Sequence, residues 1–388
     1  MIVAGVMSGT SADGINVALL RISGRGLATR LSVVEHGEYS YPAAVRRALL
    51  EAMNAPHARV GDLARLNFLL GELYAEAILA TMRQARLKRV DLVGCHGQTL
   101  YHQGEPARFL GRRLVATWQT GEAAVISARV GAPVVSDFRP ADMAAGGKGA
   151  PLVPFLDYIA YRHKRIGRIL QNIGGIANLT AIPARARVRD ILAFDTGPGN
   201  MVIDGLMERF FRKRYDRDGR VAAQGRVLED VVTDLLALPY FHQRPPKAAG
   251  REQFGREFVR DFRRRCHGAR KEDQVATATA LTARSIADAI HRFVLHPGAQ
   301  KKAARPSLSQ LIVSGGGARN LTLMRMLASH LEPKGLRVLT AAEVGVPSEA
   351  KEAIAFAVMA YQTWLRQPSN VPSATGAKRA VVLGKVSF

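Results

Sequence analysis

The feature that constrains this chain most is a pair of short apolar runs joined by a glycine-rich turn, and this pattern occurs twice. Residues 2–7 and 15–22 are rich in Val, Ile and Leu, and Gly, Ser, Thr and Asp lie between them. Residues 168–173 and 176–182 repeat the pattern around the pair 174–175. Apolar runs bounded by such residues are typical of paired strands. Two related half-chains, each opening with a β-hairpin, are therefore the simplest architecture.

The remaining sequence alternates between helical and strand patterns. Apolar residues at three- and four-residue spacings predict helices at residues 43–89, 122–129, 201–211, 321–331 and 349–366. Short apolar runs predict strands at residues 90–94, 113–117, 133–136, 191–194 and 310–314. This alternation favours an α/β fold with ligands at the strand ends.

The chain is long enough for two domains. We predict an N-terminal lobe over residues 1–165 and a C-terminal lobe over residues 166–388. The last helix and the tail are candidates for returning to the N-terminal lobe. Residues 212–250 are basic and rich in Pro and Gly, which predicts an irregular excursion.

Composition narrows the classes of partner. The formal net charge is +23, but the basic clusters are scattered and lack interleaved aromatic residues, so we expect a solvated surface and no specific nucleic acid. No run approaches the roughly 20 apolar residues of a membrane helix, and the first residues do not resemble a signal peptide. Cys95 and Cys266 form no disulfide framework. We therefore expect a cytoplasmic protein without a membrane partner.

Glycine and small hydroxyl residues gather at turns where consecutive backbone N–H groups can face an anion. Such turns occur at residues 8–11, 174–175 and 196–199, and Asp13 and Asp195 lie beside them. A carboxylate next to phosphate requires a cation, usually Mg²⁺, so these two aspartates are the candidate metal ligands. The chain has no GxxxxGKS/T motif and no GxGxxG after a strand. The sequence therefore predicts a polyphosphate site outside those two classes.

The segment 137–151 follows a predicted strand and carries Asp137, Arg139 and Asp142 before a glycine-rich stretch. Loops at the ends of buried strands often carry catalytic groups. An aspartate there can act as a general base beside a transferable phosphoryl group. The neighbouring glycines lead us to expect an exposed Asp142, and an ion pair between Asp137 and Arg139 is the structural alternative.

The chain contains, in order from residue 3 to residue 386, the segments GVMSGTSADGINVALL, GCHGQTLYH, VSDFRPADMAAGGKGAPLVP, NIGGIANLT, FDTGPGNMVID, VSGGGARNLTLM, EAIAFAVMA and VLGKV. These segments resemble the motifs of the anhydro-N-acetylmuramic acid kinases, a family of the actin-like ATPase and sugar-kinase superfamily. The resemblance covers the chain outside residues 212–305. It implies a two-lobed actin-like ATPase fold, related to ribonuclease H, with an interdomain cleft.

The resemblance also implies an activity. The family's reaction opens the bridge of 1,6-anhydro-N-acetylmuramic acid with water and phosphorylates O6. Its products are N-acetylmuramic acid 6-phosphate and ADP, and it serves peptidoglycan recycling. ATP and Mg²⁺ are the implied cofactors, and a homodimer is compatible with the family. By motif, Asp142 best matches the catalytic aspartate that activates water, and Asp137 is the second candidate.

Matching the family motifs assigns contacts to individual residues. Nucleotide contacts are implied for Gly9, Thr10, Ser11, Ala12, Asp13, Gly14, Ile15, Asn16, Gly174, Gly175, Asp195, Gly197, Gly199, Asn200, Gly315, Gly316 and Gly317. Sugar contacts are implied for His96, Gln98, Thr99, Arg139 and Glu352.

The chain departs from the family pattern at two positions that bear on its chemistry. Asn16 stands where the family usually has Asp, which removes a charge near the expected metal. Lys148 stands where Gln is usual and adds a cation, which favours a substrate with the lactyl carboxylate. Two alternatives follow from the residues: a kinase for levoglucosan, and a non-catalytic protein that binds nucleotide together with a sugar or a polyanion.

Overall fold

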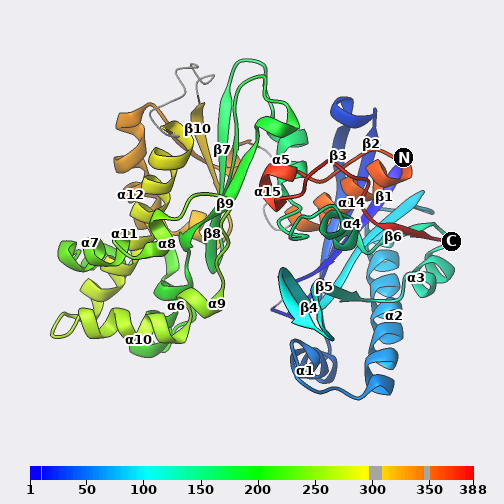
Figure 1. The fold of residues 1–388 in the computed structure, drawn as a ribbon, viewed down its shortest axis with the longest axis horizontal. Helices are drawn as coiled ribbons and strands as arrows, with labels where there is room; N and C mark the ends of the chain where they lie inside the picture. Colours follow the sequence, from blue (N-terminus) through cyan, green and yellow to red (C-terminus); the bar gives the residue numbers. More distant parts are fainter. Residues whose placement is uncertain (10, 297–307, 345–349) are drawn as a thin grey trace. The chain divides into compact units, whose positions relative to one another are not determined.

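The computed structural model describes residues 1–388 except 10, 297–307 and 345–349 (Figure 1). The chain divides into two compact units. The first unit is Met1–Ala160 together with Glu349–Phe388, and the second unit is Tyr161–Ser348. The end of the chain thus belongs with its beginning, while the sequence division lay at residue 165. The interdomain cleft stays a prediction.

The first unit is built on a seven-stranded sheet in the order β12-β6-β4-β1-β2-β3, with β5 paired to β4. Its strands are β1 (Ile2–Ser8), β2 (Gly14–Ser23), β3 (Arg30–Ser40), β4 (Leu92–Phe109), β5 (Arg112–Thr120), β6 (Val134–Ser136) and β12 (Lys385–Ser387). β1 is antiparallel to β2, and β2 is antiparallel to β3. On the other side, β1 is parallel to β4, and β4 is parallel to β6. The first hairpin therefore forms as predicted.

The second unit repeats this arrangement in a five-stranded sheet of order β11-β10-β7-β8-β9. Its strands are β7 (Gly167–Ile173), β8 (Ile176–Ile182), β9 (Leu192–Pro198), β10 (Leu308–Ser314) and β11 (Arg337–Thr340). β7 is antiparallel to β8 and β8 to β9, while β7, β10 and β11 run parallel. Both units therefore share the ribonuclease H-like strand order, which confirms the predicted α/β fold of two related lobes.

Helices flank the sheets of both units (Figure 1). In the first unit and at its junction they are α1 (Ala43–Ala52), α2 (Val60–Gln84), α3 (Ala123–Val130), α4 (Phe138–Ala144), α5 (Pro154–Tyr161), α14 (Lys351–Trp364) and α15 (Pro372–Thr375). In the second unit they are α6 (Met201–Phe211), α7 (Glu229–Leu236), α8 (Pro239–His242), α9 (Arg251–Phe254), α10 (Arg256–Arg265), α11 (Lys271–Ala289), α12 (Leu321–Leu331) and α13 (Ala341–Val344).

Three sequence expectations are corrected by these elements. The helical region over residues 43–89 is two helices, α1 and α2. The strand expected at 90–94 continues to Phe109 as one arm of the long β4–β5 hairpin. The excursion at 212–250 is not irregular throughout, because it contains α7 and α8. Among the helices of the described ranges, none is both long enough and apolar enough to cross a membrane.

Helix α14 packs directly onto the central strands of the first unit through small residues. Its inward residues include Ala353, Ala357 and Ala360, all of them buried. A Cβ added to Gly5 of β1 would overlap the carbonyl oxygen of Ala353, and one added to Gly94 of β4 would overlap that of Phe356. The helix backbone therefore lies against the strand backbone, and only glycine leaves enough room for it.

We expect Gly94→Ala to lower the free energy of unfolding by at least about 2 kcal/mol, because the added methyl must displace the α14 backbone. Urea denaturation measures this change. Gly61→Ala in α2 is the matched control, since a Cβ there meets nothing closer than a flexible arginine end at 3.6 Å. Equal stability of the two variants would contradict this packing.

Candidate active site

The turn between β7 and β8 and the turn after β9 in the second unit lie in direct backbone contact. The N–H of Gly199 donates to the carbonyl oxygen of Gly175 at 2.9 Å, and that of Asn200 donates to Gly174 at 2.7 Å. A Cβ at Gly199 would overlap the carbonyl oxygen of Gly174. The structure therefore joins two of the glycine turns that the sequence predicts to face phosphate.

A third glycine turn, Gly315–Gly317 after β10, lies against the same strand end. A Cβ at Gly315 would come within 2.7 Å of the Oδ1 of Asn172, and one at Gly317 would overlap the side chain of Ile173. The side-chain amide of Asn200 donates to the carbonyl oxygen of Ile173 at 3.1 Å. Three turns from three strands thus meet at one end of the sheet, where backbone N–H groups can surround an anion.

Asp195 of β9 lies at the base of this group of turns and is held by several hydrogen bonds. Its Oδ2 accepts from the backbone N–H of Ala249 at 2.8 Å. Its own N–H donates to the carbonyl oxygen of Lys247 at 3.1 Å, and its carbonyl oxygen accepts from the Tyr240 hydroxyl at 2.8 Å. Its Oδ1 has no hydrogen-bond partner among the described residues.

The surroundings of Asp195 change its acidity. Burial raises the pKa of Asp195 to about 6, while the Ala249 hydrogen bond and the charge of Lys247 act in the opposite direction. A carboxylate with this pKa is ionised at neutral pH and binds a proton more readily than an exposed aspartate. Those are the properties of a general base.

Sequence reasoning missed a second carboxylate in this region, Asp204 on the first turn of α6. Burial raises the pKa of Asp204 to about 6 as well. Its main-chain N–H donates to Asn200 at 2.7 Å, which ties it to the turn after β9. The sequence did offer a signal for Asp204: it is an acidic residue in a largely apolar helix that begins at a glycine turn.

In the first unit, the turn after β1 is held by buried polar side chains. The hydroxyl of Ser8 donates to Gln98 Oε1 at 2.6 Å, and the amide of Gln98 donates to the carbonyl oxygen of Gly9 at 3.1 Å. The Tyr41 hydroxyl donates to Ser8 Oγ at 2.9 Å. Ala12 is buried in the left-handed region at φ 51°, a strained conformation for a residue other than glycine. Thr10 lies outside the described residues.

Gln98 therefore differs from its expected role. The family resemblance assigned it to a sugar pocket, but its side chain is fully buried and bonded to the turn after β1. We assign it to holding this turn, because its amide and carbonyl groups are both used there.

The two candidate polar ligands of the first turn have different surroundings. The carboxylate of Asp13 is exposed and pairs with Arg46 at 3.1 Å. The Oδ1 of Asn16 is buried and has no hydrogen-bond partner among the described residues. An unpartnered buried oxygen is unfavourable, so a water or ligand donor at Asn16 would satisfy it. Asn16 thus fits a ligand-facing role better than Asp13.

Asp142 is not exposed, contrary to expectation. It is fully buried, and its Oδ2 accepts from the N–H of Gly149 at 2.9 Å. Its Oδ1 accepts from the Asn370 amide and the Thr375 hydroxyl, each at 2.7 Å. Both oxygens are thus occupied by donors from the glycine-rich loop and the chain end. The expected exposure of Asp142 is therefore wrong, because the glycine-rich loop and the chain end enclose its carboxylate. Its role as the base stays a prediction, which this arrangement does not favour.

Asp137 lies at the end of β6 in a left-handed conformation with φ 53°. Its Oδ2 accepts from the ammonium group of Lys385 at 2.8 Å. The ion pair with Arg139 that we considered is not formed, because Arg139 has other partners. A strained residue at a strand end can mark a functional site, yet this carboxylate is engaged at the sheet edge with β12.

Three residues of the predicted sugar site do lie together in the first unit. Arg139 donates to His96 Nε2 from Nε at 3.1 Å and from Nη2 at 2.9 Å, and its Nη1 donates to the carbonyl oxygen of Gly149 at 2.8 Å. Because Nε2 accepts, the proton of His96 is on Nδ1, 2.8 Å from the carbonyl oxygen of Gly97. Glu352, exposed at the start of α14, contributes a nearby negative charge.

Burial first, and the charge of Arg139 second, lower the pKa of His96 well below its ordinary value. His96 is therefore neutral and accepts hydrogen bonds. Burial lowers the pKa of Arg139 to about 10, and Glu352 opposes this change, so the guanidinium stays charged at neutral pH. A charged Arg139 held by a neutral histidine is a rigid donor group, suited to a polar or anionic substrate.

Thr99 and Lys148 both have polar partners within the first unit. Thr99 on β4 accepts from the Gln119 amide at 3.3 Å. Lys148 pairs with Glu105 at 2.5 Å, so the cation that we expected near the substrate has a counter-ion in this unit. Lys148 therefore offers less free positive charge to a lactyl carboxylate than its sequence position predicts.

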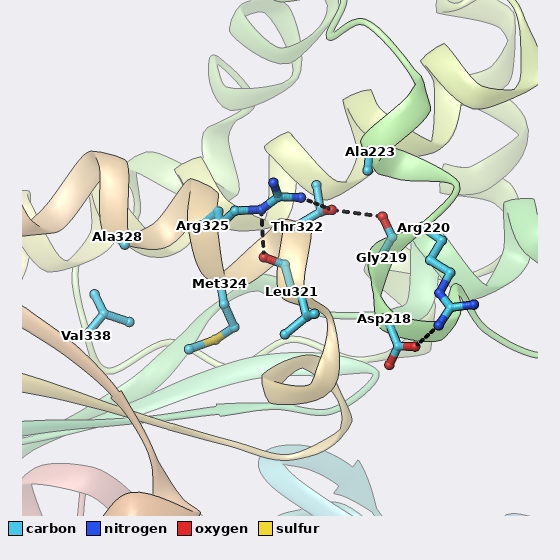
Figure 2. Close-up of a pocket in the computed structure, with 10 residues that line it drawn as sticks. All are labelled: Asp218, Gly219, Arg220, Ala223, Leu321, Thr322, Met324, Arg325, Ala328 and Val338. Atoms are coloured by element: carbon cyan, nitrogen blue, oxygen red, sulfur yellow. Dashed lines mark hydrogen bonds and ion pairs between the residues drawn. The ribbon is translucent and has the colours of Figure 1, made fainter.

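A pocket of about 720 Å³ lies along α12 in the second unit (Figure 2). Leu321, Met324 and Val338 provide its apolar wall. Its two arginines are already engaged, since Arg220 pairs with Asp218 at 3.1 Å and Arg325 donates to Thr322 at 3.1 Å. The pocket therefore has an apolar surface, and the two arginines at its edge already have polar partners. It lacks the converging charged groups that catalysis requires.

Each unit has a ribonuclease H-like sheet with glycine turns at its strand ends, and two such units are the fold of the actin-like ATPases and sugar kinases. The sequence profile described as "Anhydro-N-acetylmuramic acid kinase" matches residues 1–388. This chain therefore belongs to the anhydro-N-acetylmuramic acid kinase family.

Individual relatives agree with the profile. Proteins of Bacillus thuringiensis subsp. konkukian (strain 97-27) and Bacillus anthracis, both named anhydro-N-acetylmuramic acid kinase, are 42% identical to this chain over 390 residues. Each alignment covers 100% of this chain and 99% of the relative.

Solved structures with similar folds are more distant. The Acidaminococcus fermentans (R)-2-hydroxyglutaryl-CoA dehydratase component A is 13% identical, with a TM-score of 0.44, over 93% of this chain and 98% of that chain. A ROK family glucokinase from Streptomyces griseus, solved with glucose and AMPPNP, is 14% identical, with a TM-score of 0.39, over 93% of this chain and 100% of that chain.

We expect Asp142→Asn to lower the free energy of unfolding by about 3 kcal/mol. Both oxygens of Asp142 accept hydrogen bonds, from the Gly149 N–H on one side and from Asn370 and Thr375 on the other. The amide of asparagine has only one oxygen, so its NH₂ group would face donors on one of these sides. Urea denaturation tests this, with the exposed Asp62→Asn as control. Wild-type stability combined with lost turnover would instead restore Asp142 as a catalytic candidate.

Proposed function

We propose that this protein phosphorylates 1,6-anhydro-N-acetylmuramic acid at the expense of ATP, with Asp195 as the base that activates water. Family membership supports the kinase activity. The observation that carries the residue assignment is the environment of Asp195, a half-buried carboxylate with a pKa of about 6 that lies on β9 directly before the glycine turn at residues 196–199. Among the aspartates that the sequence analysis proposed, both oxygens of Asp142 accept hydrogen bonds and Asp137 is paired with Lys385. Asp195 is the one of these that combines a raised pKa with an oxygen that has no hydrogen-bond partner among the described residues.

The reaction requires a base for water. Water attacks the anomeric carbon, and its proton passes to the free Oδ1 of Asp195. The bond between that carbon and O6 breaks, and the released O6 attacks the γ-phosphorus as ADP departs. One anhydrosugar, one water and one ATP thus give the 6-phosphate and ADP. The proton on Asp195 returns to solvent after turnover.

The remaining roles follow from the two groups of turns. We assign phosphate contacts to the backbone N–H groups of Gly174, Gly175 and Gly199 in the second unit, and to the turn Gly9–Asn16 in the first. The turn Gly315–Gly317 would lie near the adenosine. Arg139, fixed by His96, is the proposed donor to the sugar, with Glu352 and Thr99 beside it.

We also propose that Mg²⁺ binds together with ATP, and the oxygen atoms available in the structure fit this ion. Mg²⁺ usually keeps several waters and takes few protein ligands. Among the described residues there is no cluster of three or more His, Cys, Asp or Glu side chains, and such a cluster is not required for this mode. Within the first unit, the unpartnered Oδ1 of Asn16 would accept from the hydration shell. When bound, the ion neutralises charge on the transferred phosphoryl group.

We propose a cytoplasmic location, because the reaction uses ATP and a cell-wall sugar that is recycled inside the cell. A homodimer stays a prediction.

The decisive experiment is ADP release with purified protein, ATP, Mg²⁺ and 1,6-anhydro-N-acetylmuramic acid. We expect turnover with this sugar and a much lower kcat/KM with levoglucosan. Nucleotide binding without turnover on either sugar would favour the non-catalytic alternative.

Asp195→Asn is expected to lower kcat by at least about 1,000-fold, because an amide cannot take the proton from water. Its unfolding midpoint should stay close to that of the wild type, since an amide oxygen can still accept from Ala249. Coupled ADP detection measures kcat, and calorimetric titration with ATP checks that nucleotide binding survives. A variant with wild-type kcat would remove Asp195 from the role of base.

The pH profile provides an independent check. Asp195 acts as a base only when ionised, and its pKa is about 6. We therefore expect kcat/KM to rise with pH through about 6 and to fall about tenfold per unit below it. A profile that is flat between pH 5 and pH 8 would contradict this assignment.

A further inference from the structure

The carboxylate of Asp142 joins two segments of the first unit that are far apart in the sequence. Its Oδ2 accepts from the N–H of Gly149 at 2.9 Å, in the glycine-rich loop 145–149 that follows α4. Its Oδ1 accepts from the Thr375 hydroxyl and the Asn370 amide, each at 2.7 Å. Both of these donor residues are buried. One buried carboxylate therefore fixes the glycine-rich loop to a distant part of the chain.

Main-chain hydrogen bonds join the same two segments. The N–H of Lys148 donates to the carbonyl oxygen of Thr375 at 2.8 Å, and the N–H of Lys378 donates to that of Ala145 at 2.9 Å. Together with the two side-chain donors, these bonds tie residues 370–378, which we call the C-terminal segment, to the glycine-rich loop. The loop is therefore held from both of its ends.

Gly149 connects this assembly to Arg139, the proposed donor to the sugar. The carbonyl oxygen of Gly149 accepts from Arg139 Nη1 at 2.8 Å, while its N–H donates to Asp142. Its backbone is in the left-handed region at φ 73°, and an added Cβ would come within 2.8 Å of the Met143 side chain. Gly149 is thus held between the carboxylate and the guanidinium, and its peptide groups cannot rotate without breaking one of these hydrogen bonds.

The orientation of the Arg139 guanidinium depends on acceptors at two of its edges. Nε and Nη2 both donate to His96 Nε2, at 3.1 Å and 2.9 Å. Nη1 has the carbonyl oxygen of Gly149 as its acceptor. A guanidinium is planar, so two acceptors at different edges fix its orientation, whereas one acceptor leaves it free to swing. The position of Gly149 therefore decides where the remaining donors of Arg139 point.

We infer that Thr375 and Asn370 are positioning residues for Arg139. Through the Asp142 carboxylate they fix Gly149, whose carbonyl oxygen orients the guanidinium. This inference rests on the proposed function, in which Arg139 donates to the sugar, and it gives the C-terminal segment a part in sugar recognition. Removing one donor leaves a buried carboxylate oxygen short of a partner, so the loop that this carboxylate holds becomes mobile.

Four variants of the full chain separate this role from a general loss of stability. Thr375→Val removes the hydroxyl donor and keeps the shape of the side chain, while Thr375→Ser keeps the hydroxyl. Arg139→Lys replaces the fork of donors by a single nitrogen. The matched control is Thr81→Val, because Thr81 is also a buried threonine of the first unit and its hydroxyl donates to Ala77 in α2. Urea denaturation compares the stability of the two valine variants.

The first readout requires neither sugar nor turnover. The ¹H–¹⁵N signal of the Arg139 Nε–H, identified by its absence in Arg139→Lys, is followed during exchange with water. We expect about tenfold faster exchange in Thr375→Val, and a rate within about twofold of the wild type in Thr375→Ser and Thr81→Val. An unchanged rate in folded Thr375→Val overturns the inference. If Thr375→Val does not fold, Asn370→Ala, which removes the second donor to the same oxygen, decides.

The second readout is the Kd of 1,6-anhydro-N-acetylmuramic acid, measured by calorimetric titration. We expect Thr375→Val to raise this Kd about tenfold in the wild-type background and less than about twofold in the Arg139→Lys background, because both changes act on the same donor. An equal rise in both backgrounds overturns the inference, since Thr375 would then act elsewhere.

The two readouts together distinguish this inference from the proposed function. Faster exchange in Thr375→Val with an unchanged Kd would support the role of Thr375 toward Arg139, and it would show that Arg139 does not bind the sugar. A wild-type protein that binds no sugar would refute the proposed function, and the exchange rate of the Arg139 Nε–H would still decide the inference.

Discussion

The turn after β9 lies so close to the turn after β7 that the carbonyl oxygen of Gly174 occupies the space where a side chain at Gly199 would begin. Two hydrogen bonds cross this contact, and the Gly315–Gly317 turn packs against the same strand end. Backbone groups from three strands can converge there only because side chains are absent. The position of Asp195, the orientation of the N–H groups and the start of α6 all depend on this contact.

For the aspartates of this chain, the hydrogen-bond partners in the structure indicate a role more directly than the sequence motif that contains the residue. Asp142 stands in a glycine-rich loop, yet three donors occupy its oxygens, and it connects that loop to the chain end. Asp137 has a lysine partner at the sheet edge. Asp195 keeps one oxygen without a partner among the described residues and has a raised pKa. Proton transfer needs an accessible lone pair, which the arrangement around Asp142 does not provide and the arrangement around Asp195 does.

Much of the fold could be predicted because its signals are local. Apolar runs around glycine turns gave both hairpins, and periodicity gave α6 and α12 with the bounds that the structure has. Other parts depend on tertiary contacts without a local signal. β3 has largely exposed residues, so its sequence lacks the apolar alternation of a strand. The family assignment was also available, since its motifs are short, ordered and specific.

The site was predicted less completely, because hydrogen bonds between distant segments decide which polar residue is free. Asn370 and Thr375 lie more than 200 positions from Asp142 in sequence, and nothing near Asp142 signals them. The same reason hid the hydrogen bond from Ala249 to the Asp195 carboxylate, because α6, α7 and α8 lie between these two residues in the sequence. The glycine turns of the second unit at residues 174–175 and 196–199 were correctly grouped, since each carries its own backbone signal. His96 and Arg139 of the predicted sugar site are also in contact.

The excursion after α6 illustrates how a site can depend on sequence that matches no catalytic motif. Burial strengthens electrostatic interactions at Asp195 but also penalises its charge. The segment 240–249 provides the contacts that hold Asp195: the N–H of Ala249 donates to its Oδ2, the carbonyl oxygen of Lys247 accepts its N–H, and the Tyr240 hydroxyl donates to its carbonyl oxygen. These contacts form only when this segment is folded against β9, so the geometry around Asp195 depends on sequence that lies outside the glycine turns.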